Sequence, residues 1–142
     1  MDIKINQSAI TLCPKLLVVL KQKIAERSAD EDISQITVNF RDSSYNAVTG
    51  GYHPVEISLQ KDGSDSGWNV LYITDFCYDG YPYAELVKEV DFDFNASTFF
   101  LTNCTPTSIT RSTVKDFYKS WENNFLSYLE YDAFDQIEVS GW

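Results

Sequence analysis

Short segments in which apolar and polar residues alternate dominate the middle of the chain and limit the folds that it can adopt. Residues 36–41, 55–60 and 89–94 place an apolar side chain at every second position, the period of a strand with one buried face. Residues 98–103 follow as a further strand after a short turn. Residues 68–76 are largely apolar on both faces, so we expect a central strand that is covered on both sides. The links are mostly too short for crossover helices, which predicts an antiparallel sheet.

Two segments have helical periodicity instead. Pro14 suits the first turn of a helix, and the apolar residues after it have helical spacing, which predicts a helix over residues 14–27. A second helix is predicted over residues 113–131, beginning with a capping box from Thr113 to Asp116. The tail adds a last strand around residues 137–139. We therefore predict one α+β domain over residues 1–142: a twisted antiparallel sheet of about five to seven strands, flanked by an N-terminal and a C-terminal helix.

The apolar face of the second predicted helix is broader than one sheet face requires. A wide face of this kind suggests contact with a second surface, such as another subunit. The candidate oligomer surface consists of Trp121, Phe125, Leu126 and Tyr131. An equally acceptable interpretation is that the tyrosine rings lie at the rim of the core with their hydroxyls in water.

The charge of the chain is strongly acidic and uneven. Eleven Lys and Arg residues oppose 21 Asp and Glu residues, a formal net charge of −10. Residues 1–27 contain five basic and two acidic residues, whereas the remainder contains six basic and 19 acidic residues. Such a surface repels nucleic-acid phosphates, so we expect no direct nucleic-acid binding. It favours basic protein partners, or it serves solubility alone.

The cysteines and the apolar runs indicate the compartment. Three widely spaced cysteines without a C-x-x-C pair argue for reduced thiols rather than disulfides or a zinc knuckle. The longest apolar run is residues 16–20, far short of the roughly 20 residues that span a bilayer. We therefore expect a cytoplasmic protein without membrane contact, and no motif predicts a cofactor.

An acidic stripe is the first candidate site. Glu89, Asp91 and Asp93 alternate along one predicted strand, so their carboxylates are expected on one face. Carboxylates in such an arrangement can bind Mg²⁺ or Ca²⁺, or act as an acid–base pair. The alternative interpretation is a solvated acidic sheet face, because Asp and Glu are mostly exposed in proteins.

The long loop between the first two predicted strands is the second candidate. It contains Arg41, Asp42 and Tyr45, and it ends near His53, the only histidine. Long loops often carry function. The residue types of a Ser–His–Asp triad are present, but no nucleophile elbow surrounds them. A structural loop is the default interpretation.

The third candidate is the turn that contains Tyr81 and Tyr83. Asp-Gly and Tyr-Pro pairs predict a turn between two strands at this point. Tyrosine is enriched in protein interfaces, so these side chains are candidates for recognition. They are equally suited to covering the edge of the core.

Five segments in fixed order carry a resemblance to a known family. They are Asn39-Phe40-Arg41-Asp42-Ser43-Ser44-Tyr45, Gly50-Gly51-Tyr52-His53-Pro54-Val55-Glu56-Ile57, Tyr72-Ile73-Thr74-Asp75-Phe76, Glu85-Leu86-Val87-Lys88-Glu89-Val90-Asp91-Phe92-Asp93 and Asn124-Phe125-Leu126-Ser127-Tyr128. Over residues 33–140 the chain resembles an uncharacterised bacterial domain-of-unknown-function family, met in marine gram-negative bacteria and on their mobile genetic elements. No catalytic residues are established for that family, so none is transferred to this chain.

That family is in turn similar, in fold, to the acidic mitochondrial matrix glycoprotein family, which includes the receptor for the globular heads of complement. The likeness implies an acidic trimer that binds many partners. The leading hypothesis is therefore a non-catalytic acidic scaffold protein that self-associates and binds basic partner proteins. Two alternatives stay open: a nucleic-acid mimic that occupies a DNA-binding protein, and a metal-assisted hydrolase that uses the acidic stripe or the His53 loop.

Overall fold

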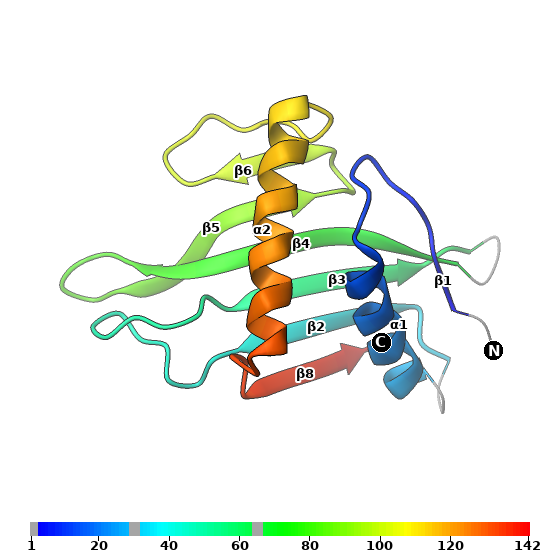
Figure 1. Cartoon of the computed structure of the whole chain (residues 1–142), viewed down its shortest axis with the longest axis horizontal. Helices are drawn as coiled ribbons and strands as arrows, with labels where there is room; N and C mark the ends of the chain where they lie inside the picture. Colours follow the sequence, from blue (N-terminus) through cyan, green and yellow to red (C-terminus); the bar gives the residue numbers. More distant parts are fainter. Residues whose placement is uncertain (1–2, 29–31, 64–66) are drawn as a thin grey trace.

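One mixed sheet forms the framework of the computed structural model, which describes residues 3–28, 32–63 and 67–142 (Figure 1). The helices are α1 (Pro14–Ser28) and α2 (Ser112–Glu130). The strands are β1 (Lys4–Ile5), β2 (Gln35–Arg41), β3 (Val55–Lys61), β4 (Gly67–Asp79), β5 (Glu85–Asp93), β6 (Thr98–Leu101), β7 (Thr107–Ser108) and β8 (Gln136–Gly141). Their order in the sheet is β7-β6-β5-β4-β3-β2-β8, with every neighbouring pair antiparallel. The short β1 pairs with β4 in parallel.

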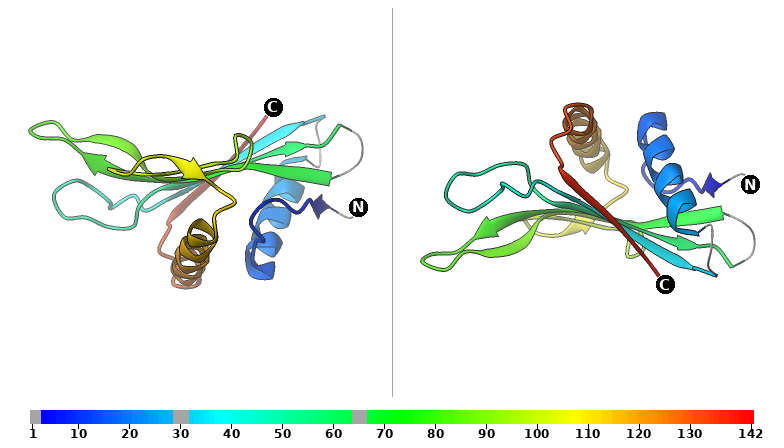
Figure 2. Two further views of the ribbon diagram at one scale, coloured as in Figure 1. Left: turned by 90° about the horizontal axis from the view of Figure 1, so that it is seen from above. Right: turned by 90° about the horizontal axis from the view of Figure 1, so that it is seen from below.

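Both helices lie on the same face of the sheet, so the protein has two layers (Figure 2). This confirms the predicted α+β class and the central position of β4. The prediction that β4 is covered on both sides was wrong, because no described helix lies on the opposite face. Leu71, Tyr72 and Phe76 on β4 are only partly buried. The broad apolar character of this strand therefore does not require a second covering layer.

The core lies between the sheet and the two helices. Phe40 on β2 and Phe92 on β5 are completely buried, as are Leu16 and Leu20 on α1. The Phe40 ring meets the Phe125 ring of α2 edge to face, with centroids 5.1 Å apart. Aromatic pairs favour this arrangement, which adds about 0.5–1.5 kcal/mol beyond the burial of their area.

The helix ends agree with the sequence at α1 and differ from it at α2. α1 begins at Pro14, as predicted. α2 begins at Ser112, and the extended Arg111 before it makes no side-chain capping bond. The capping box predicted from Thr113 was therefore wrong, because Thr113 already lies within the first helical turn. Neither α1 nor α2, the helices of the described residues, combines the length and apolar character needed to cross a membrane.

Candidate functional site

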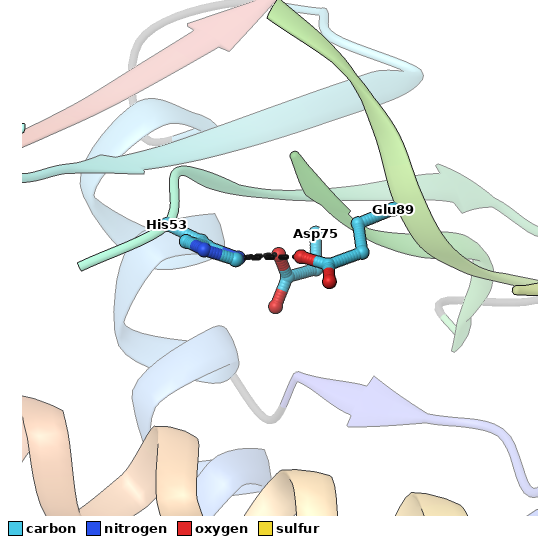
Figure 3. A group of neighbouring side chains, drawn as sticks. All are labelled: His53, Asp75 and Glu89. Carbon is cyan, nitrogen blue, oxygen red and sulfur yellow. Dashed lines mark hydrogen bonds and ion pairs between the residues drawn. The ribbon is translucent and has the colours of Figure 1, made fainter. Parts of the chain in front are cut away.

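Three ionisable side chains from three segments meet on the helix-covered face of the sheet (Figure 3). His53 comes from the loop before β3, Asp75 from β4 and Glu89 from β5. The His53 Nδ1 atom lies 2.9 Å from Asp75 Oδ1 and 2.8 Å from Glu89 Oε2. Their side chains are 36%, 15% and 32% exposed, respectively, so the group is partly shielded from water.

A β-bulge brings Glu89 into this group. In the antiparallel register Asp75 pairs with Val90 and Phe76 pairs with Lys88, which leaves Glu89 as the extra residue of β5. An extra residue shifts the alternation of side chains between the two faces of a sheet. Glu89 therefore turns toward His53 and Asp75 on the helix side.

The same bulge divides the acidic stripe expected from the sequence. Asp91 is 8% exposed and accepts a hydrogen bond of 2.8 Å from the Thr74 hydroxyl. It also lies 3.4 Å from the Lys88 ammonium group. Asp93 accepts a bond of 2.8 Å from the Ala96 backbone. Asp91 and Asp93 thus lie on the face without helices, apart from Glu89.

Trp121 on α2 forms a hydrogen bond with Asp75. Its indole Nε1–H donates to Asp75 Oδ2 at 3.0 Å, so the other oxygen of Asp75 faces His53. The hydrogen bond with Asp75 raises the pKa of the His53 imidazole, and the nearby charges of Asp75 and Glu89 act in the same direction, against the effect of burial. His53 is therefore well suited to carry a positive charge between the two carboxylates.

A cavity of about 210 Å³ opens beside this group. His53, Asp75 and Asn124 supply its polar side chains. The remaining wall is mostly aromatic and comes from the loop, α2 and the segment before β8: Tyr52, Trp121, Phe125, Tyr128 and Phe134. Water or a small ligand can therefore approach the His53 group from this side.

The arrangement does not resemble a nucleophilic active site. The Ser44 hydroxyl donates to Asp42 at 2.6 Å, and the Ser43 hydroxyl donates to Asp135, so neither is paired with His53. Burial and the neighbouring Glu89 raise the pKa of the Cys77 thiol, which keeps it protonated. Nitrogen and carboxylate oxygens at such short separations can instead hold a proton or a metal ion.

The loop before β3 is held by Asp42. One of its carboxylate oxygens accepts bonds from the Ser44 backbone and hydroxyl, and the other accepts a bond of 3.0 Å from the Tyr52 backbone. Tyr45 packs against His53 with ring centroids 5.4 Å apart, and its hydroxyl accepts a bond from the Tyr78 backbone. Of the loop residues selected from the sequence, Tyr45 and His53 thus meet, whereas Arg41 is exposed at the end of β2.

The remaining sequence candidates lie elsewhere. Tyr81 and Tyr83 lie in the turn between β4 and β5 and are 97% and 88% exposed. In the predicted oligomer surface, Phe125 is 1% exposed and belongs to the core, whereas Tyr131 is 73% exposed. The other two members of that surface, Trp121 and Leu126, are partly buried against the core.

Sequence reasoning missed Asp75 and the contact that Trp121 makes with it. One signal was available: Asp75 shares a face with the buried Ile73 in a strand that is largely apolar. A carboxylate at such a position requires a partner, because an unpaired buried charge is costly. The identity of the partner depends on which strand lies beside β4.

Comparisons with known proteins agree on a family without an assigned function. Residues 14–140 match the family described as "Protein of unknown function (DUF2787)". The hypothetical protein VC0508 from the Vibrio cholerae VSP-II pathogenicity island is 31% identical, with a TM-score of 0.91 over 99% of this chain and 100% of the other. The conserved hypothetical protein VC1805 from pathogenicity island VPI-2 of Vibrio cholerae is 34% identical, with a TM-score of 0.85 over 96% and 99% of the chains. The structure of VC1805 is described as sharing structural homology with the human P32 protein. No curated protein matches the chain.

Proposed function

The chain belongs to the DUF2787 family of proteins of unknown function, and from this membership and the surface of the fold we propose that it is a non-catalytic acidic scaffold protein. In this proposal it self-associates and binds basic segments of partner proteins. The fold likeness between VC1805 and human P32 supports a scaffold role. The family resemblance seen in the sequence leads to the same P32-like fold, and it implies an acidic assembly that binds many partners.

The observation that carries the proposal is the composition of one end of the sheet. There the loop of residues 42–54 and the hairpin of residues 77–87 project beyond the helices (Figure 2). Together these two segments contain three carboxylates and no Lys or Arg. We call them the acidic loops.

The acidic loops combine charge with exposed aromatic rings. Asp79 and Glu85 are exposed on either side of Tyr81 and Tyr83. Tyrosine faces attract Arg and Lys side chains by cation–π interaction, and neighbouring carboxylates attract the same cations. A flexible basic segment is therefore the partner chemistry that best fits this surface.

Binding of a labelled peptide of alternating Lys and Arg residues tests the partner chemistry. We expect binding that weakens as the salt concentration rises, because exposed charges are screened over about 8–10 Å near physiological salt. The double variant Asp79→Asn/Glu85→Gln should weaken binding several-fold. The matched control Asp116→Asn/Asp132→Asn removes two exposed charges on and after α2 and should bind like wild type. Equal losses in both variants would reduce the proposal to non-specific attraction by net charge.

Capture of partners from a cell lysate separates the scaffold from a nucleic-acid mimic. Partners of a scaffold should include basic proteins that remain bound when duplex DNA is added. A DNA-binding protein that is released by competing DNA would favour the mimic instead.

Self-association has support from exposed apolar side chains on the helix layer. Tyr131 after α2 and Val18 on α1 are 73% and 65% exposed. Lys21 and Arg27 are also exposed on α1, so basic side chains of this helix are available to the acidic surface of a second copy. Light scattering coupled to size-exclusion chromatography should give a multiple of the 16.2 kDa chain mass, and Tyr131→Ser/Val18→Ser should shift it toward one chain. A wild-type protein that stays monomeric at high concentration would contradict this part of the proposal.

A further inference from the structure

We propose that His53, Asp75 and Glu89 form a site for a divalent transition-metal ion, with Zn²⁺ as the best match. One ligand atom from each side chain lies within 4.8 Å of the other two. Ligands around Zn²⁺ are bound at about 2.0–2.2 Å and are therefore roughly 3–3.5 Å apart. The distances from His53 Nδ1 to Asp75 Oδ1 and Glu89 Oε2, 2.9 and 2.8 Å, already approach that spacing.

The hydrogen-bonding capacity of the group points in the same direction. Two carboxylate oxygens face one nitrogen, and that nitrogen carries at most one proton. One hydrogen therefore has to serve two acceptors. A metal ion at the same place is shared by all three atoms, and its two positive charges match the two carboxylates.

Surrounding side chains hold the ligands in place, as the outer partners of metal ligands do. Trp121 Nε1–H binds the Asp75 oxygen that faces away from His53. The Cys77 thiol is hydrogen-bonded to Glu89. Tyr45 packs against the imidazole ring. Each of the three ligands thus has a neighbour that restricts its orientation.

The ligand set selects the metal class. Ca²⁺ requires six to eight oxygen ligands, and Mg²⁺ favours oxygen ligands and retains several waters. Imidazole with two carboxylates suits Zn²⁺ and neighbouring transition metals better. Three protein ligands leave a fourth position open, and the cavity beside His53 and Asp75 admits water to it. His53 belongs to one of the acidic loops, but Asp79 and Glu85, which are substituted to test partner binding, are not among the three ligands.

Titration of the metal-free full-length chain with ZnCl₂, followed by calorimetry, tests the site. We expect one Zn²⁺ per chain and a higher melting temperature in its presence. Glu89→Gln should weaken Zn²⁺ binding by at least about 10–100-fold. Loss of a residue that only hydrogen-bonds to a metal ligand already has an effect of this size, and Glu89 is itself a proposed ligand. Glu85→Gln makes the same chemical change at an exposed position of the same strand and should bind Zn²⁺ like wild type.

Nuclear magnetic resonance provides a readout that needs no variant. The chain has one histidine, so its imidazole signals are unambiguous. Zn²⁺ should shift the His53 ring signals in proportion to the bound fraction, with the largest change at Nδ1. The proposal is overturned if these signals do not respond to Zn²⁺. It is equally overturned if Glu89→Gln, with an unchanged circular dichroism spectrum, retains wild-type affinity, because Zn²⁺ would then be bound elsewhere, for example at the exposed Cys104.

Discussion

The Glu122 carboxylate on α2 accepts a hydrogen bond from the backbone N–H of Cys13, at 3.0 Å, immediately before α1. The same oxygen accepts a bond of 2.7 Å from the Tyr118 hydroxyl. Glu122 is only 7% exposed, so both bonds are sheltered from water. A negative charge at the N-terminus of a helix is also favoured by the helix dipole. Glu122 therefore joins two helices whose sequence positions are far apart.

Replacement of Glu122 should show how much this connection stabilises the fold. We expect Glu122→Ala to lower the free energy of unfolding by about 2–4 kcal/mol, because it leaves the Cys13 N–H and the Tyr118 hydroxyl without their acceptor. Glu122→Gln retains an acceptor and should cost about 1 kcal/mol. Urea unfolding measures both. Glu130→Ala, on the same helix but 66% exposed, is the control and should cost about 0.5 kcal/mol or less. Equal losses at Glu122 and Glu130 would contradict the connection.

Gly51 lies where a side chain cannot be accommodated. Its φ is +143°, and an added Cβ would lie 2.8 Å from Asp42 Oδ2 and 2.9 Å from the Tyr45 backbone. Gly51→Ala should therefore destabilise the protein by about 1–3 kcal/mol in thermal or urea unfolding. Gly63→Ala has open space around the new methyl group and should be neutral within about 0.5 kcal/mol. A neutral Gly51→Ala would show that the loop adapts freely.

Asp42 should make stability depend on acid pH. The hydrogen bond from the Ser44 hydroxyl, followed by the one from the Tyr52 backbone, lowers the pKa of Asp42 below its usual value of 3.8. A carboxyl group with a lowered pKa in the folded state stabilises the fold above the unfolded pKa, and this contribution is lost as the pH falls through the folded pKa. Asp42→Asn should thus be less stable than wild type at pH 7, with a difference that shrinks below about pH 4. Urea unfolding from pH 7 to pH 3 checks this, and a difference that is constant with pH would contradict it.

The bond between Trp121 and Asp75 can be measured apart from the packing of the indole ring. Trp121 stacks on Phe125 with centroids 5.2 Å apart, and Trp121→Phe keeps a ring at that position while removing the N–H donor. We expect Trp121→Phe to lower the free energy of unfolding by about 1 kcal/mol, the usual net value of a hydrogen bond. The loss is larger if the acceptor is charged. In an Asp75→Ala background the same substitution should cost clearly less. A double-mutant cycle of Trp121→Phe and Asp75→Ala, measured by urea unfolding, gives the energy of the bond. Additive losses of unfolding free energy would mean that the indole acts only through packing.

Much of the fold follows from local patterns along the chain. Residues 36–41 alternate with the period of a half-buried strand, and they occur in the sheet as β2. The helical spacing after Pro14 likewise predicts α1, because the residues that repeat on one helical face are those that the core buries: Leu16, Leu20 and Ile24. Periodicity is a property of neighbouring residues, so it can be read without the partner surface.

The candidate site could not be predicted in this way. Alternation placed Glu89 beside Asp91 and Asp93, whereas the bulge opposite Asp75 turns Glu89 to the other face. The position of a bulge depends on how two strands are paired, and that is not encoded in either strand alone. The sequence contains His53 and Asp75, but no pattern of neighbouring residues indicated that the two side chains are in contact.

The sequence by itself determined the two helices, most strands of the sheet, the acidic net charge and the face that β2 and β3 bury over most of their length. The tertiary structure decided which apolar side chains are buried in the core and which remain exposed. Phe125 belongs to an apolar helix face that suits a second subunit, yet Phe40 of the same chain already covers it. It also decided that His53, Asp75 and Glu89 meet, because contacts between distant segments depend on strand order, register and the path of loops, whereas periodicity reports only on residues a few positions apart.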